Sequence, residues 1–371
     1  MKKSLALLAL SPLFARDLLD LANFDEEYEA SPLQQKVGLD IISDDNYRLR
    51  GDAATILRAY YTAELTDRQP TTTNKLQFRF GTMNSDDDSE MNTFLQYFYL
   101  NRLDAKSNLS FDFRFRDQIS DDIATNNQGD IAYQDINASV KYGYGLTKRL
   151  GVNVRPFFSR RDFDEGSRND STTYGAGVTL RRKLTPTSSA TLAANFSDTD
   201  YDNRSSFDRN SSRLTVGFEK RASFTDAFNF SVGLQNTSYD ATTDDKQNLY
   251  LSLGWNKKLS PLASINTFIV HSQDQEVFAT NKNESLKLGF EYTKFVSPHK
   301  SQLALGATYV HFDTEGILSG VEDSNDVFRS HVRYTHVITQ DLNLKATLNY
   351  LSNAELDQSR TNIGLGAYLS F

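Results

Sequence analysis

The sequence predicts an all-β chain that closes into a transmembrane antiparallel β-barrel of about 18 strands. Apolar and polar residues alternate with a period of two almost continuously from residue 34 to residue 371. Short turns and longer polar loops alternate between these runs, and the chain ends on an aromatic residue that is in phase with the last run. A helix would spread such apolar residues around its whole circumference, so the pattern favours strands.

Composition excludes several other classes. The 371 residues include no Cys, and 40 Lys+Arg against 48 Asp+Glu give a formal net charge of −8. The lack of Cys excludes a disulfide framework and a thiolate metal site, and the acidic total argues against nucleic acid as a partner. No apolar run reaches the roughly 18 residues of a membrane-spanning helix, which excludes a helical membrane protein. It does not exclude a membrane β-barrel, because every second residue of a barrel strand is polar.

The first residues resemble an export signal. Lys2 and Lys3 precede a short apolar stretch at 5–10, and Ala15 offers a cleavage site. We therefore predict a signal peptide at 1–15, an acidic periplasmic segment at 16–33 and the barrel at 34–371. The alternative for the first residues is a frayed N-terminal helix.

The strands follow from the alternation in chain order. In the run 107–116, Phe111 and Phe113 alternate with Asp112 and Arg114. Runs of about ten residues suit a tilted crossing of the hydrocarbon layer. An even count places both termini and the short turns on the periplasmic side, and the long loops outside. The run 34–43 is the weakest, so 16 strands is the alternative count. The predicted strands are 34–43, 56–65, 75–83, 91–100, 107–116, 132–144, 148–158, 172–183, 187–197, 210–220, 227–237, 247–257, 261–271, 284–294, 300–311, 326–337, 341–350 and 361–371.

The polar face of each strand is predicted to face the lumen. An apolar interior could not fill a barrel of this width, so the apolar face must contact lipid. Leu251→Arg is therefore expected to be costly and Ser252→Arg to be tolerated. Rings of Lys and Arg in a pore favour anions, although pairing with acids across neighbouring strands would explain the same residues. The predicted pore-lining cations are Arg58, Arg79, Arg114, Arg116, Lys141, Arg155, Arg181, Arg213, Lys287, Arg329, Arg333 and Lys345.

The last strand carries an assembly signal. Leu369 and Phe371 stand on its apolar face, and the chain ends at the aromatic residue. This pattern is typical of the C-terminal strand that barrel assembly machinery recognises. We therefore predict that machinery, together with outer-membrane lipid and lipopolysaccharide, as partners.

The sequence offers no catalytic or metal-binding motif. It has five His residues, and none has metal-ligand spacing. His331 and His336 are five apart, so they face opposite sides of one strand. His271 and His311 have polar neighbours but are interpreted as surface residues. We predict no catalytic residues, no metal and no cofactor.

Short segments resemble a known family. The sequence Asp44-Asp45-Asn46-Tyr47-Arg48 resembles a segment near the start of the β-barrel porin 2 family, which includes barrels associated with exopolysaccharide and exosortase systems. The stretches 161–163, 174–178 and 183–186 are similar to that family's repeating hairpin. The resemblance implies a bacterial outer-membrane barrel that helps to pass a secreted polysaccharide. It offers no catalytic residues to carry over.

Three functions are compatible with this sequence. The first is an outer-membrane channel, porin-like, with an anionic polysaccharide among its solutes. The second is a non-conducting barrel that acts as a structural or docking part of an envelope export machine. The third is a barrel enzyme, which the lack of catalytic motifs disfavours.

Overall fold

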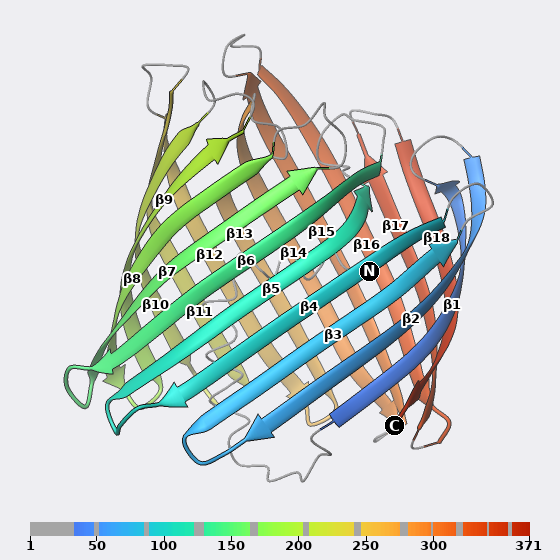
Figure 1. Cartoon of the computed structure of the whole chain (residues 1–371), viewed down its shortest axis with the longest axis horizontal. Coiled ribbons are helices and arrows are strands. Elements are labelled where there is room, and N and C mark those ends of the chain that lie inside the picture. Colours follow the sequence, from blue (N-terminus) through green and yellow to red (C-terminus); the bar gives the residue numbers. More distant parts are fainter. Residues whose placement is uncertain are drawn as a thin grey trace. The chain divides into compact units, whose positions relative to one another are not determined.

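The computed structural model describes residues 33–47, 52–84, 89–121, 130–163, 170–202, 208–240, 246–274, 281–297, 300–316, 322–339, 341–354 and 358–371. The strands form one closed 18-stranded antiparallel sheet in which each strand pairs with its neighbours in sequence, and β18 pairs with β1 to close it (Figure 1). The predicted all-β barrel is confirmed, with 18 rather than 16 strands. Among the described residues, no helix is long and apolar enough to cross a membrane. The predicted signal peptide at 1–15 and nearly all of the segment at 16–33 lie outside the described residues.

The observed strands are longer than the predicted ones. They span from 12 residues in β13 and β17 to 17 residues in β2 and β14. The extra residues lie mainly at the ends that carry the longer loops, where polar residues still pair although they no longer alternate with apolar ones. The strands are β1 Leu33–Tyr47, β2 Asp52–Arg68, β3 Thr72–Asn84, β4 Ser89–Arg102, β5 Ser107–Asp121, β6 Asp130–Gly145, β7 Leu150–Phe163, β8 Ser171–Thr185, β9 Ser188–Tyr201, β10 Arg209–Arg221, β11 Asp226–Tyr239, β12 Lys246–Ser260, β13 Ala263–Asp274, β14 Asn281–Ser297, β15 Ser301–Gly316, β16 Glu322–Val337, β17 Leu342–Asn353 and β18 Gln358–Ser370.

The short turns have local hydrogen bonds that close them. In the turn between β4 and β5, the Asp104 carboxylate accepts the backbone N–H groups of Lys106 and Ser107 at 2.6 and 2.8 Å. These bonds favour the charged carboxylate and lower the pKa of Asp104 below its ordinary value. This is the side-chain-to-backbone bonding that makes Asp a preferred turn residue.

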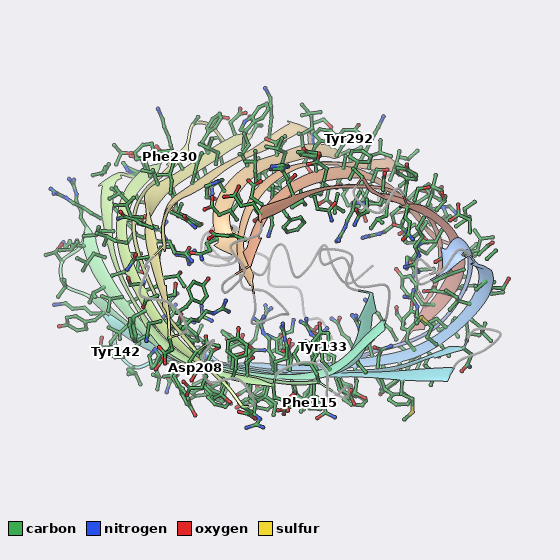
Figure 2. All side chains as sticks on the ribbon, turned by 90° about the horizontal axis from the view of Figure 1, so that it is seen from above. Phe115, Tyr133, Tyr142, Asp208, Phe230 and Tyr292 are labelled. Atoms are coloured by element: carbon green, nitrogen blue, oxygen red, sulfur yellow. The ribbon has the colours of Figure 1, made fainter. Side chains whose placement is uncertain are left out.

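The two faces of the wall differ as predicted. Large apolar side chains are exposed on the outer face, among them Leu39 and Leu214, each 56% exposed. Phe115 and Phe230 point outward and Tyr133 points into the barrel (Figure 2). An exposed apolar belt around a closed barrel is stable only against lipid, so the barrel spans a membrane.

The expectation that Ser252→Arg is tolerated stays a prediction, because its site is more enclosed than alternation alone suggests. Ser252 lies on the inner face, as predicted, but it is only 7% exposed and pairs in register with Ser231, which is 4% exposed. Neighbouring side chains therefore cover this position, and an arginine would have to extend past them to reach the lumen. Alternation gives the direction of a side chain, but it does not give the space around it.

Several glycines of the inner face lie beneath aromatic rings of the next strand. Gly38 pairs with Tyr60, and Gly289 pairs with Phe268. A Cβ atom at Gly289 would lie 2.1 Å from ring atoms of Phe268, so the ring occupies the space that a side chain would need. These glycines allow close packing of the wall, which agrees with a structural rather than a ligand-binding role.

Candidate functional site

The inner wall, defined as the face that carries Asp40, is the candidate functional site. Residues that pair in register on neighbouring strands lie on the same face of the wall, and Asp40 on β1 pairs with Arg58 on β2. The registers of the successive strand pairs assign the inner-facing residues of each strand from β2 to β12. The registers from β12 to β18, and from β18 back to β1, complete the assignment consistently. By this register, the structure places every predicted pore-lining cation on the inner wall: Arg58, Arg79, Arg114, Arg116, Lys141, Arg155, Arg181, Arg213, Lys287, Arg329, Arg333 and Lys345.

Some of these cations are neutralised at the closure of the barrel. The Asp40 carboxylate accepts a hydrogen bond from Arg58, and the Lys345 ammonium lies 3.8 Å from the same carboxylate. Further along β1, the Arg360 guanidinium donates to Asp44 at 2.7 Å. The Asp40 and Asp44 side chains are 4% and 0% exposed. These ion pairs join β1 to β2, β17 and β18 and stabilise closure, and two carboxylates balance part of the charge of three cations.

Two more cations have acid partners. Arg114 donates to Asp112 on its own strand at 2.8 Å, and Arg181 donates to Glu219 at 2.6 Å across two strand spacings. Ser189 also donates to Glu219, at 3.2 Å. A second group has no carboxylate within ion-pair distance in the part of the chain that the structure describes. This group consists of Arg79, Arg116, Lys141, Arg155, Arg213 and Arg333.

Two members of this unneutralised group face one another. The β6–β7 register pairs Ser139 with Phe157 and Tyr142 with Val154, which sets Lys141 opposite Arg155. Like charges directly opposite on neighbouring strands are destabilising unless a counter-ion offsets them. Asp112 on β5 attracts Arg155 and offsets part of this repulsion.

Sequence analysis missed several cations of the inner wall. Lys36 and Lys75 lie within predicted strands, and three others lie outside them. Arg161, Arg209 and Arg360 lie at or just past the ends of the predicted strands 148–158, 210–220 and 361–371. Each belongs to an observed strand, and each is in phase with the inner wall. Continuing the alternation by one to three residues would have found them.

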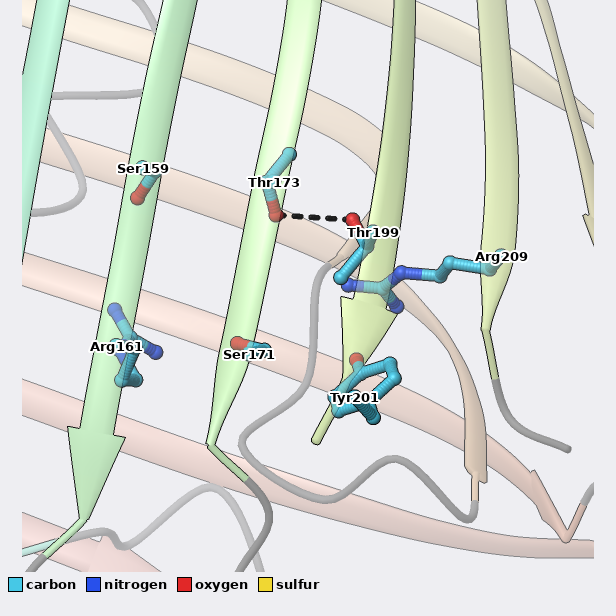
Figure 3. A pocket seen from close by; sticks show the side chains of 7 residues that line it. All are labelled: Ser159, Arg161, Ser171, Thr173, Thr199, Tyr201 and Arg209. Atoms are coloured by element: carbon cyan, nitrogen blue, oxygen red, sulfur yellow. Dashed lines mark hydrogen bonds between the residues drawn. The ribbon is translucent and has the colours of Figure 1, made fainter. Parts of the chain in front are cut away.

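A small recess indents the inner wall of β7–β10 near the long loops. It has a volume of about 50 Å³. The Thr173 and Thr199 hydroxyls lie 3.0 Å apart beside it, and the Arg209 guanidinium carbon lies 5.9 Å from the centre of the Tyr201 ring (Figure 3). The lining residues are Ser159, Arg161, Ser171, Thr173, Thr199, Tyr201 and Arg209. Its hydroxyl and guanidinium groups suit a polar solute.

Carboxylates gather at the same end of the barrel. Asp162, Asp170 and Asp202 each offer an oxygen within 4.8 Å of the others. Arg160 donates to Asp162 at 2.8 Å and to Asp202 at 3.4 Å. The arginine therefore balances part of this charge.

Asp208, in the loop before β10, has an altered acidity. Its burial, and the neighbouring carboxylates of Asp200, Asp240 and Asp198, raise the pKa of Asp208 above its ordinary value. The backbone N–H of Tyr201, which donates to it at 2.7 Å, opposes this change. Asp208 therefore loses its negative charge at a higher pH than an isolated aspartate would.

The histidines are dispersed. His331 lies on the inner wall opposite Gly306, whereas His336 on the same strand bonds to Ser301 at 2.8 Å on the outer face. His311 contacts Asp326 at 2.7 Å, also on the outer face. Their placement on opposite faces follows the predicted parity.

Comparisons with known proteins find the fold but no close relative. No protein-family model and no curated protein matches the chain in sequence. OccK2 (OpdF) of Pseudomonas aeruginosa, solved in complex with glucuronate, is 10% identical with a TM-score of 0.52, over 92% of this chain and 96% of that one. OccK5 (OpdH) of the same organism is 11% identical with a TM-score of 0.51, over 91% and 97%. The siderophore receptor PirA of P. aeruginosa is 9% identical with a TM-score of 0.51, over 93% and 81%.

At these identities the likeness shows the fold alone. The chain has the fold of bacterial outer-membrane porins and receptors. With its apolar outer face, this fold indicates a barrel that spans a membrane. The resemblance to the β-barrel porin 2 family stays a prediction.

Proposed function

We propose that this protein is an open outer-membrane channel whose inner wall favours anionic solutes, with a secreted anionic polysaccharide as one such solute. The observation that carries the proposal is the unneutralised group of inner-wall cations. Fixed positive charge along a pore attracts anions and repels cations, and the low-dielectric wall strengthens the effect. Lipopolysaccharide around the apolar belt and the barrel assembly machinery are the partners that this function requires. The proposal needs no cofactor, metal or catalytic residue.

The reversal potential across a salt gradient tests the proposal. We expect the full-length protein in a planar bilayer to conduct and its reversal potential to show anion preference. The preference should weaken as salt rises, because the screening length falls from about 10 Å at 0.1 M to about 3 Å at 1 M. Cation preference would contradict the proposal. The absence of any current would instead favour the non-conducting docking barrel.

A further inference from the structure

Phe94 on β4 lies between two arginines of the neighbouring strands. Arg79 on β3 and Arg116 on β5 both pair in register with Phe94. All three side chains belong to the inner wall and are half-buried. The guanidinium carbon of Arg116 lies 5.9 Å from the centre of the Phe94 ring. Two guanidinium groups therefore flank one aromatic ring along a single row of the wall.

The nearest inner-wall acids are engaged elsewhere. Asp135 lies opposite Arg116 in register, but its two carboxylate oxygens accept hydrogen bonds from Arg161 at 2.8 and 3.2 Å. Glu64, on the strand beside Arg79, lies 2.9 Å from the Lys75 ammonium. Arg79 and Arg116 thus have no acid partner among the described residues, and their positive charge is directed at the lumen.

We propose that Arg79, Phe94 and Arg116 form a binding site for small carboxylates that carry an apolar ring. A guanidinium fork matches the two oxygens of a carboxylate, and charge-assisted hydrogen bonds of this kind are about twice as strong as neutral ones. The Phe94 ring offers an apolar surface against which the ring of the ligand packs in an offset or tilted arrangement. The site deepens the proposed function and rests on it, because it assigns a class of solute to the same lumen.

Arg114 provides a matched control. It lies two residues from Arg116 on β5, so it faces the same lumen at nearly the same depth. Its guanidinium donates to both oxygens of Asp112, at 2.8 and 3.1 Å. Arg114→Gln removes the same formal charge as Arg116→Gln, but it removes a charge that is already neutralised.

The test measures benzoate binding to the full-length protein in detergent micelles by calorimetry, and benzoate block of the current in a planar bilayer. We expect Arg79→Gln and Arg116→Gln each to weaken binding about tenfold, which corresponds to the loss of one hydrogen bond to a charged group. Arg114→Gln should change it little. Phe94→Leu should weaken binding of benzoate but leave that of acetate, which has no ring, unchanged. A band that shifts on heating in gel electrophoresis verifies that each variant is folded.

The outcomes separate this site from the channel itself. Benzoate binding in micelles without any current in bilayers would support the site and contradict the channel. A conducting wild type that neither binds nor responds to benzoate would overturn the site alone, as would equal losses in Arg114→Gln and Arg116→Gln. If Arg79→Gln does not fold, Arg79→Lys keeps the charge and removes the fork. Unchanged benzoate binding in Arg79→Lys would then overturn the bidentate recognition proposed here.

Discussion

Val178→Arg is expected to prevent stable insertion of the barrel, whereas Thr179→Arg is not. Val178 lies midway along β8 on the outer face and is 42% exposed, which means that it contacts lipid in the membrane. A guanidinium at that depth costs about 2–4 kcal/mol. Thr179 is the next residue, at nearly the same depth, but it faces the lumen and is half-buried rather than buried. An arginine there can reach water.

The measurement is the fraction of each variant that folds into lipid vesicles across a urea titration, read from the heat-shifted band. The two variants introduce the same side chain at adjacent positions of one strand. A difference in folding between the two variants therefore reports only which face of the wall the arginine is on. Equal loss of folding in both variants would show that the assignment of faces is wrong.

Deletion of Phe371 is expected to reduce assembly much more than it reduces the stability of the folded barrel. The Phe371 side chain is 64% exposed beyond the end of β18, so it contributes little packing. Its backbone exchanges two hydrogen bonds with Gln35 of β1, at 3.0 and 2.9 Å. Loss of these bonds removes about 1–3 kcal/mol. An assembly factor that reads the terminal aromatic residue would respond far more strongly.

Two measurements made side by side distinguish these effects. The amount of folded protein in outer membranes should fall sharply in the truncated chain, while refolding of the purified chain into vesicles should change little. Phe371→Tyr, which keeps an aromatic end, should restore the membrane level, and Leu369→Ala should lower it in part. Normal membrane levels of the truncated protein would refute a recognition role for Phe371.

The fold could be predicted because one physical rule governs the whole chain. A lipid-facing strand must place an apolar side chain at every second position, as Phe111 and Phe113 do on β5. That rule fails above the membrane, where water contacts both faces. The strands therefore continue past the predicted ends, so Arg161 and Arg209 lie outside the predicted strands although they belong to β7 and β10.

The division of the cations into neutralised and unneutralised ones could not be predicted. It depends on the register between strands and on distances between side chains, which alternation does not specify. Arg114 and Asp112 are two residues apart on β5, whereas Arg181 and Glu219 meet across 38 residues of sequence. The sequence alone treats Arg114 and Arg116 as equivalent, and the structure separates them.

Thiol labelling tests most directly whether the polar face of the wall lines a water-filled lumen. The chain has no Cys, so a single introduced thiol reports one position without background. Thr347 lies on the inner wall of β17, and Leu348, which is 42% exposed, lies on the outer face at nearly the same depth. In the membrane-inserted protein, we expect a charged, membrane-impermeant thiol reagent to modify Thr347→Cys quickly and Leu348→Cys hardly at all. Protection of Thr347→Cys, or equal modification of both variants, would contradict a water-filled lumen lined by the polar face.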